Sequence, residues 1–400
     1  MNLGEHGHLT YCTNIHPGES LDAVEEVLRG PVAAVKARLS PDRPFGVGLR
    51  LSAQAAEALA APERFAAFRA LLAERDLYVF TINGFPYGPF HGRPVKEAVY
   101  RPDWRDGARL AYTDRLTGLL AGLLPDEPGM AGSVSTVPGS FKPWITGADD
   151  VEAMVGNLIR HVVHLVRLRA ETGRTVALAL EPEPCCFLET VAETIAFFRN
   201  HLHAPSAAVR LAGEAGIGRG EAEEALHRHL GVCLDLCHAA VEFEDPGGML
   251  DALRGAGVAV AKMQVTAGLR LPRVGPDAED RLRPFADEVY LHQVVERTPG
   301  GLRRFRDLGE AFDAPGGTAD REWRVHFHVP LFLDDLGAFG STRDFAAAVL
   351  ERHRRSPVAP HLEVETYTWD VLPERHRTPD TVTGITKELA WVMQQLGRAG

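Results

Sequence analysis

The chain reads Thr175-Val176-Ala177-Leu178-Ala179-Leu180-Glu181 and, after a stretch of helical character, Leu230-Gly231-Val232-Cys233-Leu234-Asp235-Leu236-Cys237-His238. Each of these two runs is apolar until it reaches a side chain that can bind a metal ion. Continuous apolar runs of this length are typical of strands buried on both faces of a parallel sheet. Two parallel strands joined by a helix place their C-terminal ends side by side. We therefore expect Glu181 and Asp235 to face one another at a common mouth.

The alternation of strand and helix continues on both sides of this unit. The apolar patterns predict strands at 9–13, 45–51, 77–82, 133–137, 175–181, 230–235, 258–265, 324–329 and 361–369. About eight strand–helix repeats with short connections predict an α/β fold closed into a (β/α)8 TIM barrel. No linker divides the chain, so residues 1–400 are expected to form a single domain. Nine strands are predicted, one more than the barrel holds, and either 258–265 or 324–329 is the extra strand.

Residues 269–322 form an irregular insertion after a late strand. An insertion at the C-terminal end of a barrel strand starts on the face that carries the active site in TIM barrels. Two extended runs, 288–295 and 301–308, flank a Pro-Gly turn and predict a β-hairpin. We expect this hairpin to lie over the mouth of the barrel, with Arg304 or Arg306 binding an anionic or hydroxyl-rich part of a ligand. A solvated hairpin at the rim, or a contact between subunits, is the alternative.

Charged and polar side chains end several late strands, where barrel active sites lie. Strand alternation directs Glu181 to the same face as Ala177 and Ala179, whose small side chains suit the narrow barrel interior. The same alternation points inward the residues Asp235, Lys262, Gln264, His326, His328, Glu363 and Glu365. Inward charges are unfavourable unless they are paired or bind a metal. Carboxylates with a histidine suit Mn²⁺, Mg²⁺, Co²⁺ or Zn²⁺, and the predicted ligands are Glu181, Asp235, His328 and Glu365.

These ligand assignments have structural alternatives. Lys262 and Arg324 would neutralise Glu181 and Glu365 in a buried ion-pair network that needs no metal. Glu363, two residues earlier on the same strand, is the rival of Glu365 for the last ligand position. Acidic residues at the ends of several strands, rather than one, favour the metal or catalytic interpretation.

Other polar residues near predicted strand ends are weaker candidates. His16 and Asn83 follow early strands and are predicted to contact substrate. The alternative is a structural role, with His16 hydrogen-bonded within its loop and Asn83 serving as a turn residue. His326 is expected to pack deeper than His328.

Composition limits the classes of function. The net charge of -11 and a pI of about 5.9 argue against binding to a nucleic-acid backbone. The longest apolar stretches, such as Leu116 to Leu124, are too short to span a bilayer, and no secretory signal is visible. The 5 cysteines are expected to be reduced thiols of a cytoplasmic protein. Cys233 and Cys237 flank Asp235, where packing of small residues is favoured over a zinc site.

The segments around Glu181 and Asp235 resemble the xylose-isomerase-like TIM barrels, a superfamily of sugar isomerases, sugar epimerases and endonuclease IV. The resemblance implies a site made of a Glu ending strand five, an Asp-x-x-His ending strand six, a His ending strand seven and a Glu ending strand eight. The matching positions in this sequence are Glu181, Asp235, His238 and Glu365. The departure is at strand seven, where Gln264 stands in place of the histidine and the next histidines come only at His326 and His328.

A more specific resemblance covers most of the chain. Three long motifs are similar to those of the metabolite traffic protein EboE family, which belongs to a gene cluster linked to making or moving a secondary metabolite. The motifs are Tyr11-Cys12-Thr13-Asn14-Ile15-His16-Pro17-Gly18-Glu19, Thr81-Ile82-Asn83-Gly84-Phe85-Pro86-Tyr87-Gly88 and Glu363-Val364-Glu365-Thr366-Tyr367-Thr368-Trp369. This resemblance implies a sugar-isomerase-like barrel without implying a reaction.

The sequence favours an enzyme, a metal-dependent isomerase or epimerase acting on a sugar-like or cyclitol intermediate of an Ebo-type secondary-metabolite pathway. In this scheme Glu181 and Glu365 flank a divalent ion and move a proton, while His238 orients a substrate hydroxyl and Lys262 stabilises negative charge on oxygen. The remaining predicted contacts to a polyol or sugar-like ligand are His16, Asn83, Gln264, Arg304 and Arg306. A binding or traffic protein that lost the chemistry is the alternative, and an endonuclease IV-like phosphodiesterase is less favoured because no basic stripe is present. A homo-oligomer is compatible with this sequence.

Overall fold

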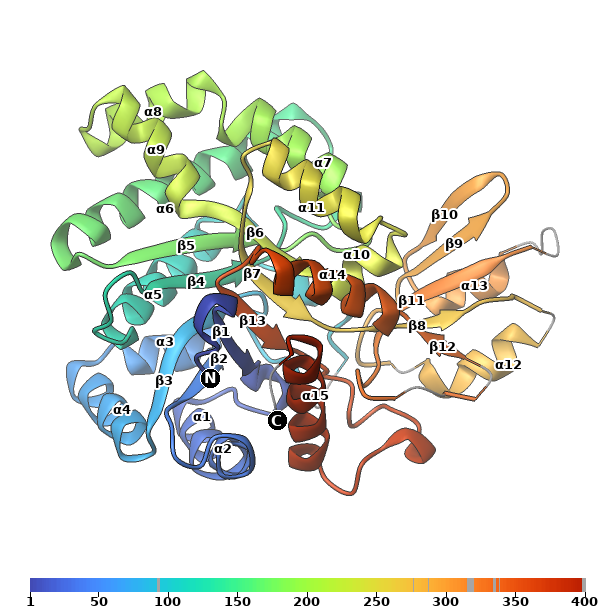
Figure 1. Cartoon of the computed structure of the whole chain (residues 1–400). Coiled ribbons are helices and arrows are strands. Elements are labelled where there is room, and N and C mark those ends of the chain that lie inside the picture. The colour runs from blue at the N-terminus through green and yellow to red at the C-terminus, as the bar shows by residue number, and fades with distance from the viewer. Residues whose placement is uncertain are drawn as a thin grey trace.

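The computed structural model describes the chain except for residues 92–93, 276, 287, 315–319, 334–335, 338 and 398–400. Eight parallel strands form the central sheet in the order β1-β13-β7-β6-β5-β4-β3-β2 (Figure 1). A parallel bridge between Cys12 and Gly48, just beyond β1 and within β2, joins the two ends of this order and closes the sheet into a barrel. The strands are β1 (His8–Tyr11), β2 (Phe45–Arg50), β3 (Leu77–Asn83), β4 (Ala131–Thr136), β5 (Thr175–Leu180), β6 (Leu230–Asp235), β7 (Ala259–Val265) and β13 (His361–Val364). The (β/α)8 barrel predicted from the sequence is confirmed.

Helices surround the barrel because each crossover between parallel strands must return along the outside of the sheet. They are α1 (Leu21–Val27), α2 (Ala33–Leu39), α3 (Ala53–Leu59), α4 (Pro62–Glu74), α5 (Gly107–Leu123), α6 (Ala148–Thr172), α7 (Val191–Phe197), α8 (Pro205–Ala215), α9 (Arg219–His229), α10 (Leu236–Val241), α11 (Pro246–Gly255), α14 (Arg343–Arg355) and α15 (Thr381–Gln395). Polar N-caps start several of them, as where Ser20 and Thr190 accept backbone N–H groups of α1 and α7. No described helix is long and apolar enough to cross a membrane.

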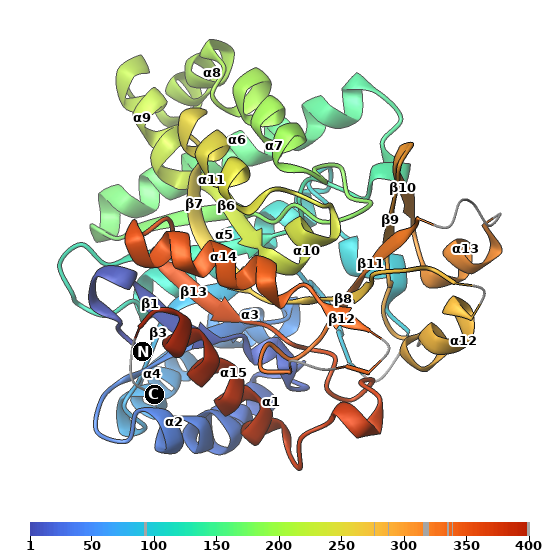
Figure 2. The ribbon, with the colours of Figure 1, turned by 45° about the vertical axis from the view of Figure 1, so that its right-hand side comes forward.

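A second sheet, here called the rim sheet, lies beside the barrel (Figures 1 and 2). It is antiparallel with the order β10-β9-β11-β8-β12, and it lies between β7 and α14 in the chain. Its strands are β8 (Gly268–Leu271), β9 (Val294–Thr298), β10 (Gly301–Phe305), β11 (Glu322–His328) and β12 (Gly340–Ser341), accompanied by the short helices α12 (Ala278–Leu282) and α13 (Leu308–Asp313). The long insertion after a late strand is therefore present.

The rim sheet resolves which of the nine predicted strands is the extra one. Residues 258–265 contribute β7, which pairs in parallel with both β6 and β13. Residues 324–329 fall largely on β11, which pairs antiparallel with β8 and β9 outside the barrel. The physical reason is connection length: α11 gives β7 the crossover helix that a parallel strand needs, whereas β11 continues from a meander.

The barrel interior is polar below its mouth. Lys262 and Glu363 are fully buried and pair at 2.5 Å, and Lys262 also donates to Ser135 at 3.3 Å. Close approach of this pair to β2 requires a glycine, since a Cβ at Gly48 would lie 1.8 Å from Glu363 Oε1. Small residues of β5, β6 and β7 (Ala177, Ala179, Cys233 and Ala261) fill the remaining space, as the alternation predicted for β5 and β6.

We predict that Lys262→Met destabilises the fold by about 3–5 kcal/mol, because it leaves the Glu363 carboxylate buried without its cation. Burial raises the pKa of Glu363 while Lys262 lowers it, so the unpaired carboxyl should take up a proton and the loss should grow as the pH rises. Urea unfolding at several pH values measures this effect. The double variant Lys262→Met/Glu363→Gln is the matched control and should recover most of the stability. A single variant within about 1 kcal/mol of the wild type would contradict a structural role for the pair.

Candidate active site

Three carboxylates from three different barrel strands meet at the C-terminal mouth. Glu181 directly follows β5, Asp235 ends β6 and Glu365 directly follows β13. All three side chains are buried, and each offers an oxygen that lies within 4.8 Å of the other two. The parallel strands predicted around residues 175–238 thus bring their terminal acids together.

Asp235 is fixed through one of its two oxygens. Its Oδ1 caps helix α10 by accepting the N–H groups of Cys237 at 2.7 Å and His238 at 3.0 Å, and it also accepts the hydroxyl of Thr266 at 2.7 Å. The other oxygen, Oδ2, is buried without a hydrogen-bond partner. The helix cap therefore orients a free carboxylate oxygen toward the acidic group.

Glu181 differs from its neighbours because its side chain makes no hydrogen bond within the described part of the chain, and its Oε2 is buried. Burial and the nearby carboxylates of Glu365 and Asp235 raise the pKa of Glu181 well above its usual value. A carboxyl group in this state either holds a proton or needs a cation close by.

Glu365 is held by three amide side chains. Its Oε1 accepts from Asn14 and, at 2.7 Å, from Asn83, while its Oε2 accepts from Gln264. Burial, together with Glu363 and Asp235, raises the pKa of Glu365. Asn83 and Gln264, both predicted to bind substrate, thus make direct contact with this carboxylate. Asn14 was not predicted, although it lies in the strand-exit motif that also contains His16.

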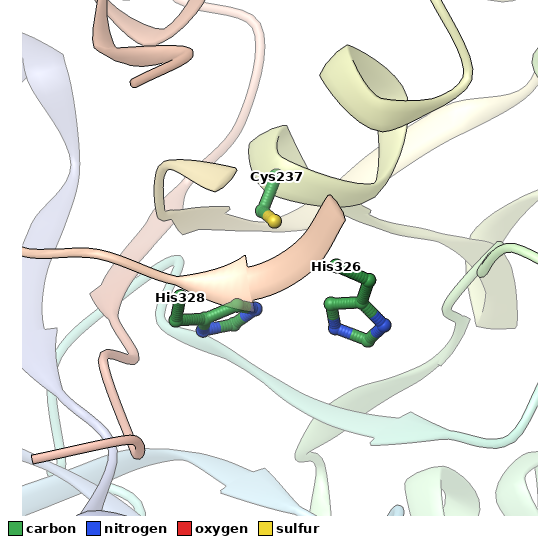
Figure 3. Close-up of side chains that lie close together, drawn as sticks. All are labelled: Cys237, His326 and His328. Atoms are coloured by element: carbon green, nitrogen blue, oxygen red, sulfur yellow. The ribbon is translucent and has the colours of Figure 1, made fainter. Parts of the chain in front are cut away.

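Three imidazoles lie beside the acidic group. His238 projects from α10, and His326 and His328 project from β11 of the rim sheet with ring centroids 5.4 Å apart (Figure 3). The Nδ1 of His328 faces the backbone carbonyl oxygen of Glu365, and its Nε2 is buried without a partner. Asp235, His238 and His328 each offer a ligand atom within 4.8 Å of the other two.

His326 is a functional candidate that sequence reasoning placed wrongly. It was expected to pack deeper than His328, yet both residues line the same pocket. The two are two residues apart on one strand and so share a face, which in the rim sheet points across the barrel mouth. Burial lowers the pKa of His326 well below its usual value and that of His328 to about 4, so both rings are neutral at pH 7 with a nitrogen lone pair available.

Cys237 also approaches these rings, from α10 (Figure 3). Its thiol would have to lose a proton before it could bind a cation. Burial and the carboxylates of Asp235 and Glu183 raise the pKa of Cys237, which disfavours that form. Cys233 donates its thiol to Gln264 Oε1 at 2.8 Å, which agrees with packing rather than a Cys-x3-Cys zinc site.

A pocket opens above the acidic group and the imidazoles. Its floor is polar, and its walls are largely aromatic and aliphatic, drawn from the loops after β3 and from the segment that precedes β9. The lining residues are Asn14, Asn83, Phe85, Pro86, Phe90, Val95, Lys96, Val99, Tyr100, Glu181, Glu183, His238, Tyr290, Leu291, His326, His328, Glu365 and Tyr367. Tyr367, two residues after Glu365 in the third motif, is part of this wall.

Several predicted site residues lie elsewhere. Lys262, predicted to stabilise charge on substrate, is paired with Glu363 inside the barrel and does not line the pocket. The Lys262–Glu363 ion pair also decides which of Glu363 and Glu365 belongs to the site. Glu363 is the partner of Lys262, whereas Glu365 faces the pocket. His16 is buried against the hydroxyl of Tyr11 at 3.2 Å and is absent from the pocket wall.

The two arginines of the predicted hairpin also make other contacts. β9 and β10 do form a hairpin, but Arg304 binds Glu242 at 2.6 Å and lies 3.5 Å from Glu189. Arg306 pairs with Glu310 at the surface. Neither arginine, for which a ligand contact was predicted, lines the pocket. Carboxylates of neighbouring loops and of α13 satisfy both guanidinium groups instead.

The metal-free alternative for the acidic group fails on the same contacts. Lys262 neutralises Glu363, and Arg324 pairs with Glu322 on its own strand at 3.1 Å. Among the described residues, no lysine or arginine forms an ion pair with Glu181 or Glu365. The negative charge at the mouth therefore has no counter-ion among those side chains.

No family model matches this chain, and none of the curated proteins matches it. The solved structures to which it is similar include the IolI protein with a bound zinc atom, at 11% identity over 97% of this chain and 99% of that chain and a TM-score of 0.48. A xylose isomerase domain protein from Alicyclobacillus acidocaldarius is 14% identical over 97% and 99%, with a TM-score of 0.45. The 3-keto-D-glucoside 4-epimerase YcjR from E. coli is 14% identical over 97% and 99%, with a TM-score of 0.44. Similarities of this size transfer no reaction, substrate or metal to this chain.

We predict that Glu181→Gln makes the metal-free protein more stable near pH 7. The pKa of Glu181 is higher in the folded state than its usual value of 4.5, so its ionisation opposes folding as the pH rises above 4.5 toward the folded-state value. The wild-type protein in chelator should lose stability over that range, and the variant should lose less. Thermal unfolding at pH 5 and pH 8 measures the difference. A variant less stable than the wild type at pH 8 would show that Glu181 has a structural partner.

Proposed function

We propose that this protein is a metal-dependent isomerase or epimerase that acts on a sugar-like or cyclitol intermediate of a secondary-metabolite pathway. The observation that carries the proposal is the buried group of Glu181, Asp235 and Glu365, which forms no ion pair with a described lysine or arginine and of which Glu181 and Glu365 line a pocket at the barrel mouth. Barrels of this type place their catalytic groups at this end of the strands.

The donor atoms fit a divalent ion. Glu181 Oε2, Asp235 Oδ2 and His328 Nε2 are all buried without partners, and unsatisfied buried polar atoms are otherwise unfavourable. Glu181, Asp235 and Glu365 would hold the ion, with His328 adjoining them through Asp235. Oxygen donors with one imidazole suit Mn²⁺, Mg²⁺, Co²⁺ or Zn²⁺. Such an ion polarises a substrate carbonyl and stabilises the negative charge that develops on its oxygen.

The proton-transfer step belongs to Glu181 rather than to both glutamates. Both oxygens of Glu365 already accept hydrogen bonds from amides, which hold this carboxylate in one orientation. Glu181 forms no such hydrogen bond within the described part of the chain, so its carboxyl group is free to take and return a proton. Isomerisation and epimerisation both need one such group to remove a proton next to a carbonyl and to deliver it again.

The pocket favours a small, neutral, oxygen-rich ligand at its floor. Asn14, Asn83 and Tyr367 offer hydrogen-bonding groups there beside the acidic floor, and Lys96 at the pocket wall is paired with Asp307 at 2.7 Å. This composition argues against a phosphate-bearing substrate, and the net charge of -11 argues against a nucleic acid. Polyols and keto-sugars fit both restrictions.

A non-catalytic metabolite-binding or traffic protein is the second candidate. The contact that favours it is between Gln264 Nε2 and Glu365, because an amide stands where the resemblance to the xylose-isomerase-like barrels implies a histidine ligand. The resemblance to the metabolite traffic protein EboE family points in the same direction. The experiment must therefore separate metal binding from proton transfer.

We predict that chelator-treated protein binds Mn²⁺ and Zn²⁺ in calorimetric titration, and that Glu181→Gln and Asp235→Asn each weaken binding by at least about tenfold, as the loss of an outer-shell partner alone does elsewhere. Glu223→Gln is the matched surface control and should change nothing. Unchanged affinity in both site variants would remove the ion from these residues.

Proton transfer is tested by incubating the metal-loaded protein in D₂O with a panel of ketoses and keto-cyclitols and following deuterium incorporation by mass spectrometry. The proposal expects exchange next to the carbonyl of at least one compound, with loss of exchange in Glu181→Gln. Binding of a panel member without any exchange would favour the traffic protein instead.

A further inference from the structure

The wall of the pocket differs in chemistry from its floor. Apart from Lys96, the charged, imidazole and amide side chains of the lining lie on β11 or within three residues of the C-terminal end of a barrel strand. The apolar and aromatic lining comes from the loop after β3, from Tyr290 and Leu291 ahead of β9, and from Tyr367 after β13. The pocket is therefore amphipathic, with a hydrogen-bonding floor supplied by the strands and an apolar wall supplied by the loops.

The polar tips of the wall residues are turned toward protein partners. The hydroxyl of Tyr100 donates to Glu183 Oε1 at 2.6 Å, and the hydroxyl of Tyr290 lies 3.1 Å from His91 Nδ1. The ammonium group of Lys96 is held in its ion pair. A ligand that lies against this wall therefore meets ring and aliphatic carbon, while the hydrogen-bonding capacity of these residues is directed into the protein.

Three aromatic rings of the wall, those of Phe90, Tyr290 and Tyr367, form one cluster, here called the aromatic trio. Their ring centroids are 5.2 Å apart for Phe90 and Tyr290, 5.3 Å for Phe90 and Tyr367, and 5.0 Å for the two tyrosines. These distances are typical of tilted and edge-to-face aromatic packing. Tyr367 also packs against His328, with ring centroids 4.6 Å apart, so the aromatic trio is continuous with the imidazole side of the floor.

An unsubstituted polyol matches only the floor of this pocket. Such a molecule carries hydroxyl groups along its whole length, and a hydroxyl group buried against the apolar wall would lose its hydrogen bonds to water without gaining a partner. An apolar ring at the same place would bury carbon against carbon and would be stabilised by the hydrophobic effect. The lining thus favours a ligand that is hydroxylated at one end and apolar at the other.

We propose that the substrate is a polyol or keto-sugar that carries an apolar ring, with the hydroxylated part on the acidic floor and the ring against the aromatic trio. The assignment of the hydroxylated part rests on the proposed function, whereas the apolar subsite requires only that the pocket binds a ligand. The aromatic trio determines specificity in this scheme, because it distinguishes a ring-bearing polyol from the free polyol.

Calorimetric titration of the full-length protein in the presence of Mn²⁺ tests the subsite with three pairs of compounds, myo-inositol, D-glucose and xylitol, each beside its mono-O-benzyl derivative. We expect at least one derivative to bind about tenfold tighter than its parent, or more, because the phenyl ring is buried. Phe90→Ala and Tyr290→Ala should each remove most of this gain. Tyr290→Phe is the matched control and should keep it, because the Tyr290 hydroxyl contacts His91.

Thermal unfolding shows whether each variant is folded. The absence of a gain on benzylation in all three pairs, a complete lack of binding included, would overturn the proposal, and so would a gain that persists in both alanine variants. The deuterium-exchange assay is independent of these results. Exchange of an unsubstituted ketose without any gain on benzylation would support the isomerase and reject the apolar subsite, whereas a gain without exchange would support the subsite in a metabolite-binding protein.

Discussion

The site depends on three buried acidic side chains that form no ion pair with a lysine or arginine in the described part of the chain. Three buried carboxylates converge within 4.8 Å, and the one lysine nearby in the barrel is already paired with Glu363. The rest of the arrangement holds these groups in place: a helix cap fixes Asp235, three amides fix Glu365, and backbone oxygens fix His238 and His328. Burial without compensation is unfavourable for folding, and proteins retain such groups where a ligand supplies the missing charge.

The barrel was predictable because its signal is local. An apolar run in the sequence predicts each buried strand. The acids at the ends of β5, β6 and β13 could be located because they stand where these runs stop. Depth along the barrel axis was not predictable from alternation alone. Lys262 and Gln264 both point inward, but two residues along a strand correspond to about 6.6 Å, which separates a sealed ion pair from the pocket floor. Glu363 and Glu365 differ in the same way.

The contacts made by the insertion could not be predicted from the sequence. A strand pattern at 324–329 gave no indication of whether it joins the barrel or a separate sheet, and this choice decides where His326 and His328 point. Likewise, the partner of Arg304 is Glu242, a residue just after α10 whose proximity exists only in three dimensions. Asn14 and Glu183 could have been found from their position, because both follow closely on predicted strands. Polar residues after strands are nevertheless too common for position alone to identify a site residue.

The position of two histidines on β11 means that the candidate site is built from two separate segments of the chain. The barrel contributes nearly all of the oxygen donors of the site, whereas two of its three imidazoles come from the inserted rim sheet. The candidate nitrogen donors and the barrel architecture are therefore encoded in separate segments of the chain. Exchange of the insertion for one without these histidines would leave the acidic residues of the barrel untouched, and oxygen donors alone suit a hard ion such as magnesium.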